Sequence, residues 1–237
     1  IYTTYTILTI QDCSEDNYIE TQQDTILFIV QNKLPSGNNS NLNKQFTFTK
    51  IKKYTIFNTN ENIKKLKNLY KGSKTLNTMN FTVSVGNVVW NQCKDILLDN
   101  PNKDDKLTRL IYNSDISNNE LKPKKYKNDK KKNFIKKDGN TDIILVINRG
   151  YGKGDYSFNY CLIDINTPYL IENHLICIKY KNNNGDEGDT RDHIKNQYKK
   201  IIKSLKHDKT HQFIKLYFAN NAINTTELND VIPIYDL

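Results

Sequence analysis

The sequence predicts an α+β fold that is mostly β, with a few helices. Three observations support this class. Short stretches rich in β-branched and aromatic residues recur along the chain, helical spacing of apolar residues occurs in only a few places, and segments rich in Asn, Asp and Gly separate them. A chain of 237 residues can form one large domain or two small ones with a sizeable core.

The first two predicted strands differ in character from the rest. Tyr2–Ile10 is rich in Thr, Ile and Tyr, and Thr25–Gln31 is a nearly continuous apolar run. Such a run is typical of a strand covered on both faces, so we interpret residues 1–32 as the closing strands of a larger sheet. The polar segment Lys33–Lys44 then marks a boundary before a second unit, residues 46–237. Because the chain begins at Ile1 rather than Met, we expect it to be a fragment of a longer protein.

The next segments predict a strand, a helix and the stretch around the single Trp. Phe46–Phe57 alternates at strand period, and Asn58–Tyr70 has helical spacing, with Asn58 as the expected N-cap and Gly72 near the end. Phe81–Val85 predicts a strand, and Gly86 and Asn87 break it. Val88–Trp90 then predicts a second strand that carries Trp90 as a core anchor.

Further strands and helices follow in the C-terminal half. Strands are predicted at Leu107–Tyr112, Asp142–Ile147, Tyr156–Ile165 and His174–Tyr180. Apolar residues at helical spacing predict a helix at Asp192–Lys206, and a short helix is predicted at Thr226–Val231.

The formal charge of +9 is carried almost entirely by lysine. A basic excess of this size suits a polyanion such as nucleic acid, although an AT-rich genome also over-uses Lys. The most charged segment, Lys122–Lys137, holds nine lysines interleaved with Tyr126 and Phe134. It is either a solvated loop or an arm that contacts phosphates. The phosphate candidates are Lys122, Lys124, Lys125, Lys127, Lys130, Lys131 and Lys132.

The glycine-rich segment Asn148–Gly154 follows a predicted strand, as in a nucleotide-binding loop. That architecture needs a helix next, whereas a strand-like segment follows here, so a hairpin turn is the better interpretation. Its tip would present Asn148, Arg149, Tyr151 and Lys153, and Arg and Asn are the side chains that read guanine and adenine in a DNA groove.

The sequence contains no complete active site. Asn166-Thr167-Pro168-Tyr169 is similar to the Asn-Pro-Pro-Tyr loop of amino-methyltransferases, but an ordinary proline turn explains it. His207 and His211 could bind a metal only on one continuous helix, and the four cysteines lack zinc-site spacing. We therefore expect no catalytic residue, metal or cofactor in this chain. With no apolar run of transmembrane length, we expect a soluble intracellular protein, in the cytoplasm or in a viral factory.

Three segments together resemble a known family. Glu20–Gln31 (ETQQDTILFIVQ), Val83–Asp95 (VSVGNVVWNQCKD) and Asn220–Tyr235 (NNAINTTELNDVIPIY) are similar, in this order, to the C-terminal part of TaqI-like, gamma-class adenine-N6 DNA methyltransferases. In that family an N-terminal Rossmann-like domain binds S-adenosylmethionine and carries the Asn-Pro-Pro-Tyr loop, and a C-terminal target-recognition domain reads the DNA. The lysine-rich segment has no counterpart in this resemblance.

The resemblance implies a role for each part of the chain. Residues 1–32 would be the closing strands of the catalytic sheet, residues 46–237 the target-recognition domain, and Tyr18 the aromatic that stacks on a flipped-out adenine. Asn91, Gln92 and Lys94 become candidates for DNA contact beside the lysine arm. Because this chain lacks the cofactor and catalytic loops, we expect it to be inactive alone and to partner with duplex DNA and a missing catalytic domain. That domain would be the one that binds S-adenosylmethionine, within a restriction-modification system.

An alternative from another class stays open. An interaction or structural protein of an AT-rich genome, possibly viral, could retain the fold without reading DNA. A metal-dependent nuclease would need an Asp followed by a strand that carries Glu-x-Lys, and none of the strands predicted here carries that pattern.

Overall fold

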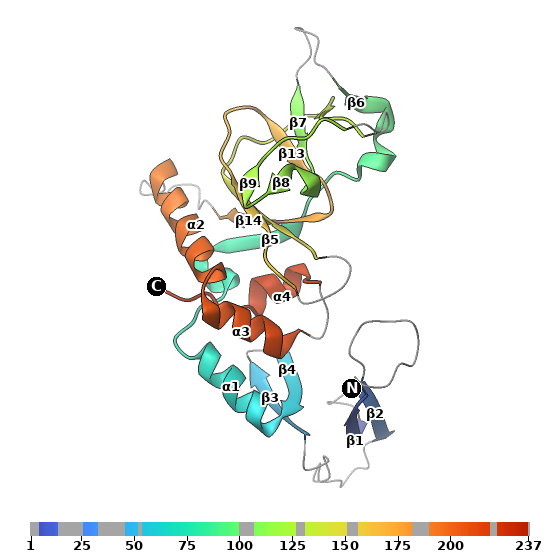
Figure 1. Cartoon of the computed structure of the whole chain (residues 1–237), viewed down its shortest axis with the longest axis vertical. Helices are drawn as coiled ribbons and strands as arrows, with labels where there is room; N and C mark the ends of the chain where they lie inside the picture. Colours follow the sequence, from blue (N-terminus) through green and yellow to red (C-terminus); the bar gives the residue numbers. More distant parts are fainter. Residues whose placement is uncertain are drawn as a thin grey trace.

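The structure, a computed structural model, combines short strands with four α-helices in the part of the chain that it describes (Figure 1). The prediction of a mostly β fold with a few helices is confirmed. The described residues are 5–13, 26–32, 46–51, 54–99, 107–126, 131–150, 156–181, 190–218 and 222–236.

The first four-stranded sheet is antiparallel and has the strand order β12-β11-β14-β5. Its strands are β12 (Tyr160–Ile163), β11 (Ile144–Asn148), β14 (Leu175–Tyr180) and β5 (Phe81–Val85). In β11 the neighbours Leu145 and Val146 point to opposite faces, and both are fully buried. The sheet is therefore covered on both sides at β11, which explains the unbroken apolar sequence of that strand.

The second four-stranded sheet has the order β13-β7-β10-β6, with β13 and β7 parallel and the other pairs antiparallel. Its strands are β13 (Tyr169–Ile171), β7 (Thr108–Ile111), β10 (Phe134–Ile135) and β6 (Leu97–Leu98). Ile111, Tyr169 and Ile171 of this sheet pack against Val146 and Cys177 of the first. Strands of two or three residues are too short to show a period, so sequence patterning found only β7.

The helices form a layer over the other face of the first sheet (Figure 1). They are α1 (Asn60–Tyr70), α2 (Arg191–Leu205), α3 (Asp208–Tyr217) and α4 (Thr225–Asp230). Tyr198 of α2, Phe213 of α3 and Leu228 of α4 are buried in one cluster with Leu145 and Ile176 of the sheet.

Two helix predictions needed correction. The N-cap of α1 is Thr59 rather than Asn58, because the Thr59 side chain accepts the hydrogen bond from the backbone N–H of Asn62. Helix α3 was missed, because a short apolar run such as Phe213–Phe218 cannot be assigned to strand or helix by periodicity alone. Helix α2 lies within one residue of its prediction at each end.

The stretch around Trp90 also differs from the prediction. Strand β5 ends at Val85, and Gly86 then passes so close to the backbone of Glu172 that a Cβ atom would lie 2.2 Å from its carbonyl oxygen. The predicted second strand is wrong: after a single bridge at Val88, the chain forms two 3-10 helices, η2 (Trp90–Gln92) and η3 (Lys94–Ile96). The polar run from Asn91 to Asp95 meets no neighbouring strand, so its backbone bonds are local.

Smaller elements complete the described chain. The remaining 3-10 helices are η1 (Leu76–Met79) and η4 (Asn113–Asp115), and the remaining hairpins are β3 (Phe46–Ile51) with β4 (Tyr54–Thr59) and β8 (Ile116–Ser117) with β9 (Glu120–Leu121). The single strand predicted over Phe46–Phe57 is thus a hairpin.

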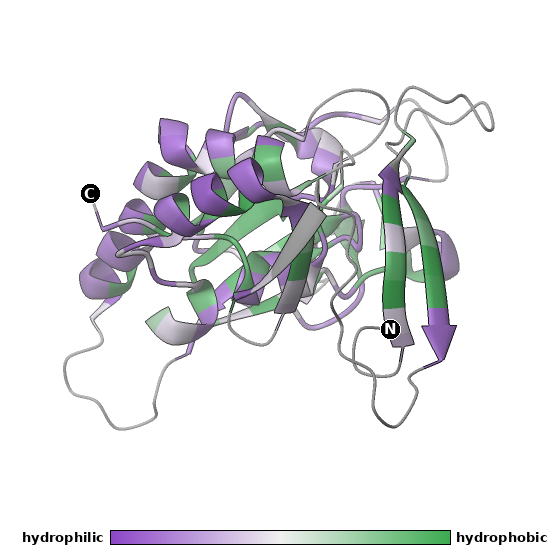
Figure 2. Ribbon diagram, turned by 90° about the horizontal axis from the view of Figure 1, so that it is seen from below, coloured by the Kyte–Doolittle hydropathy of each residue, from purple (hydrophilic) through white to green (hydrophobic). Residues whose placement is uncertain are grey.

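The N-terminal strands form a hairpin of their own, β1 (Tyr5–Asp12) with β2 (Ile26–Asn32). Within this chain the apolar run is not covered on both faces, since Ile26 is 52% exposed and Ile29 48%, and its place in a larger sheet stays a prediction. Apolar residues therefore follow the hairpin at its surface (Figure 2). Its one described aromatic contact is edge-to-face, between Phe28 and Phe57.

Among the described residues, no helix combines the length and the apolar character needed to cross a lipid bilayer.

Candidate nucleic-acid interface

A third layer covers the outer face of the second sheet. We call it the cap; it comprises η2, η3, η4 and residues 122–126 and 131–133. Each strand of the sheet contributes one buried residue to the cluster under the cap: Leu97, Leu110, Ile135 and Leu170. Trp90 and Tyr126 pack on this cluster, so Trp90 is a half-buried anchor, in line with the predicted structural role.

The cap brings together two groups of predicted site residues that are far apart in sequence. Asn91, Gln92 and Lys94 are exposed on η2 and η3, whereas Tyr126, from the lysine-rich segment, packs on the same cluster as Trp90. The backbone N–H of Lys136 donates to the carbonyl of Ile96 at 2.9 Å, which joins the two segments directly. Their side chains therefore belong to one layer of the molecule.

Within the cap, Asp115 fastens the lysine-rich segment to η4. This carboxylate is 2% exposed and accepts hydrogen bonds from the backbone N–H of Tyr112 (3.0 Å), the backbone N–H of Lys124 (2.9 Å) and the hydroxyl of Tyr126 (2.7 Å). The side-chain amide of Asn133 also donates to the Lys124 carbonyl at 3.0 Å. The two described parts of the segment are thus tied to η4 and to each other. Nothing in the sequence around Asp115 distinguishes it from an ordinary turn residue, so sequence reasoning missed it.

The described lysines among the predicted phosphate contacts fall into three groups. Lys122 and Lys132 form ion pairs, with Glu120 at 2.8 Å and with Asp99 at 3.4 Å. Lys124 and Lys125 are exposed and form no ion pair with another described residue. Lys131 is half-buried between aromatic rings. Lys127 and Lys130 lie outside the described residues.

The predicted hairpin at the glycine-rich segment is confirmed, because β11 and β12 pair antiparallel on either side of it. The side chain of Asn148 is used inside this hairpin: its oxygen accepts from the backbone N–H of Asn159 at 2.8 Å and its nitrogen donates to Ser157. Arg149 is half-buried, and its carbonyl accepts from Ile223 near α4. No described contact joins either residue to the cap. Tyr151, Lys153 and Tyr18 lie outside the described residues, and a DNA-contacting role for all five stays a prediction.

The Asn166–Tyr169 tetrapeptide is the turn that leads into β13. Tyr169 is 1% exposed, its hydroxyl donates to the carbonyl of Asp142, and burial raises its pKa well above the ordinary range. A ring held this way cannot stack on a substrate base. The geometry agrees with a proline turn between strands.

The two candidate metal ligands at the start of α3 have other roles. His207 is the N-cap, and its Nδ1 accepts the backbone N–H of Lys209 at 3.1 Å, whereas His211 is exposed one turn later. No group of three His, Cys, Asp or Glu side chains is arranged for a metal within the described ranges.

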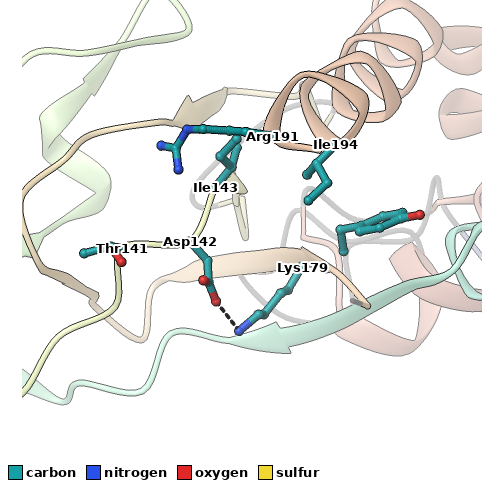
Figure 3. Close-up of a pocket in the computed structure, with 7 residues that line it drawn as sticks. Thr141, Asp142, Ile143, Lys179, Arg191 and Ile194 are labelled. Carbon is teal, nitrogen blue, oxygen red and sulfur yellow. Dashed lines mark ion pairs between the residues drawn. The ribbon is translucent and has the colours of Figure 1, made fainter. Parts of the chain in front are cut away.

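A cleft of about 260 Å³ opens at the start of α2 (Figure 3). Its two cationic side chains are already paired: Lys179 pairs with Asp142 of the cleft at 2.6 Å, and Arg191 pairs with Asp164 outside it. Because these cations are already paired, the cleft is a weaker candidate for an anionic ligand than the exposed lysines of the cap.

Comparison with known proteins gives one informative match. The chain is 28% identical over 177 residues to the type II methyltransferase M.CvrRI of Paramecium bursaria Chlorella virus XZ-6E. This chain is related to a methyltransferase. The match covers 74% of the chain but only 42% of the length of that viral methyltransferase. No family model matches the chain.

Proposed function

We propose that this chain is the DNA-recognition portion of an adenine-specific N6 DNA methyltransferase or of a fused restriction-modification enzyme. The observation that carries the proposal is the cap, where exposed Asn91, Gln92 and Lys94 share one layer with exposed Lys124 and Lys125. The relationship to a methyltransferase and the resemblance of three segments to the gamma class support it.

The division of labour on DNA follows from the chemistry of these side chains. Lysines on the cap would neutralise backbone phosphates, which gives affinity and position but no sequence information. Amide side chains such as Asn91 and Gln92 can pair with adenine in the major groove, so we assign base reading to them and to the predicted hairpin tip.

The methyl-transfer chemistry is proposed to lie outside this chain. A catalytic domain with S-adenosylmethionine and an Asn-Pro-Pro-Tyr loop would flip the adenine out of the duplex while the cap holds the flanking DNA. The exposed apolar side chains of β2 support this arrangement, because they form a surface that a separate catalytic domain could cover.

The test is a titration of fluorescent duplex DNA with the full 237-residue chain at several salt concentrations. We expect the dissociation constant to rise with salt. In the Lys124→Gln/Lys125→Gln variant, the slope of log K against log salt should shrink by about 0.9 for each phosphate that is no longer neutralised, or about 2 in total.

A matched control removes the same charge from the opposite layer of the molecule. Lys199 and Lys203 are exposed on α2 and form no ion pair with another described residue, so the Lys199→Gln/Lys203→Gln variant should keep the wild-type slope. Equal reductions in both variants would mean that the chain binds by its overall charge. No salt-dependent binding at all would favour the alternative of an interaction protein that does not read DNA.

A further inference from the structure

The ammonium group of Lys131 lies against two aromatic rings, and the residue is half-buried rather than fully exposed. Its Nζ lies 4.2 Å from the ring centroid of Tyr112 and 4.6 Å from that of Tyr126, and it donates to the hydroxyl of Ser114 at 3.3 Å. The two tyrosine rings themselves pack edge to face at 5.1 Å. A cation held between two aromatic rings gains quadrupole attraction and is no longer free to reach a phosphate.

Two buried carboxylates act electrostatically on this lysine. Asp115 is 2% exposed and Glu172 is 3% exposed, and Glu172 contacts the ring of His174. Burial is the largest effect on Lys131 and lowers its pKa, whereas both carboxylates favour its charged form. Buried negative charges need a nearby positive charge, and Lys131 lies where both carboxylates act on it.

The neighbours of Lys131 are those that tie down the lysine-rich segment. Tyr112 donates its hydroxyl to the Lys132 carbonyl at 2.7 Å, and Tyr126 bonds to both Ser114 and Asp115. Lys131 therefore sits at the centre of the contacts that hold residues 122–126 and 131–133 together.

We propose that Lys131 is a positioning residue that latches the two described parts of the lysine-rich segment to each other and to Tyr112 and η4, and that it does not itself contact phosphate. Its role toward DNA rests on the proposed function, but the latch is a property of the free chain. A segment ordered before binding loses less conformational entropy on contact with DNA, so the latch raises affinity without adding a contact. Lys124 and Lys125 are left to face the phosphates.

The latch can be tested without DNA by limited proteolysis with chymotrypsin. Cleavage after Tyr126 requires its ring to leave the cluster under the cap, so the rate reports the opening of the segment. We expect Lys131→Met to raise this rate about tenfold, as removal of a desolvated cation–π interaction implies. Lys131→Arg should restore protection, and Lys137→Met, which changes an exposed lysine of the same segment away from the cleaved bond, should cleave at the wild-type rate.

The DNA titration gives the second readout. Lys131→Met should weaken binding several-fold with an unchanged salt slope, because the same phosphates remain neutralised. Wild-type cleavage combined with a slope reduced by about 1 would overturn the proposal and make Lys131 a phosphate contact. If the wild-type chain does not bind DNA, the proposed function fails. The rates of chymotrypsin cleavage after Tyr126 still test the latch. Should Lys131→Met not fold, Lys131→Gln, which keeps a polar group near Ser114, takes its place in both measurements.

Discussion

Gly86 shows how one residue without a side chain allows two parts of the chain to meet. A Cβ atom there would lie 2.2 Å from the carbonyl oxygen and 2.6 Å from the carbonyl carbon of Glu172, and these are backbone atoms that cannot rotate away. The close approach lets Val88 bridge to Glu172 and brings η2 and Trp90 onto the second sheet.

We therefore expect Gly86→Ala to lower the free energy of unfolding by roughly 1–3 kcal/mol, the usual cost of overpacking. Urea unfolding followed by Trp90 fluorescence measures it. Gly72 is the control: it has a φ of +74°, but a Cβ atom added there would meet nothing within 4 Å. Gly72→Asn, a residue that tolerates this backbone conformation, should therefore cost far less. Equal effects of the two changes would contradict a steric role for Gly86.

At the scale of the element, α2 is attached to the first sheet in two ways. The hydroxyl of Tyr198, fully buried, accepts the backbone N–H of Tyr180 and lies within donating distance of the carbonyl groups of Ile143 and Ile178. Near the start of the helix, Asp164 pairs with both Arg191 and Lys195, the latter at 2.6 Å. The first attachment is buried, whereas the second depends on charge.

The charged attachment predicts a pH dependence. The hydrogen bond from Lys195, helped by that from Arg191, lowers the pKa of Asp164 below its ordinary value of 3.8. A lowered folded-state pKa gives stability that is complete above pH 3.8 and is lost as the pH falls through the lowered value. Asp164→Asn should therefore cost about 1 kcal/mol at pH 7 and clearly less near about pH 2.

Urea midpoints at both pH values measure this difference. Asp95→Asn, which removes an exposed carboxylate on η3, provides the matched control and should change little at either pH. A cost for Asp164→Asn that persists at low pH would show that packing, rather than charge, holds the start of α2.

At the scale of the whole molecule, the layered body and the N-terminal hairpin contrast in how they bury apolar residues. The body has helices, two sheets and the cap, with apolar clusters between successive layers. In β2, by comparison, Leu27 is 46% exposed and Ile29 48%. These two side chains lie on the face opposite Phe28, which contacts Phe57.

We expect Leu27→Lys/Ile29→Lys to reduce the binding of an apolar fluorescent dye and to leave the unfolding free energy within about 0.5 kcal/mol of wild type. Dye fluorescence and urea unfolding measure the two quantities. A clear drop in stability would instead mean that this face packs within the chain, and it would remove the support that the hairpin gives to a separate catalytic domain.

The sequence alone predicted many of the elements in which buried residues recur at a regular spacing. The class, strands β5, β7, β11, β12 and β14, helix α2 and the hairpin around Asn148–Gly154 all follow from periodicity or turn chemistry, which are local properties. Of the candidate site, the charge of the lysine-rich segment pointed to Lys124 and the family resemblance pointed to Asn91, and both residues are exposed.

Only the tertiary structure decided how these pieces meet. That Trp90 and Tyr126 share one cluster, that Asp115 fastens Lys124, and that Lys131 lies between two tyrosines depend on contacts between segments that are distant in sequence. The sequence does not distinguish a lysine that faces solvent from one that packs against an aromatic ring. Its role is set by which surface the rest of the fold places around it.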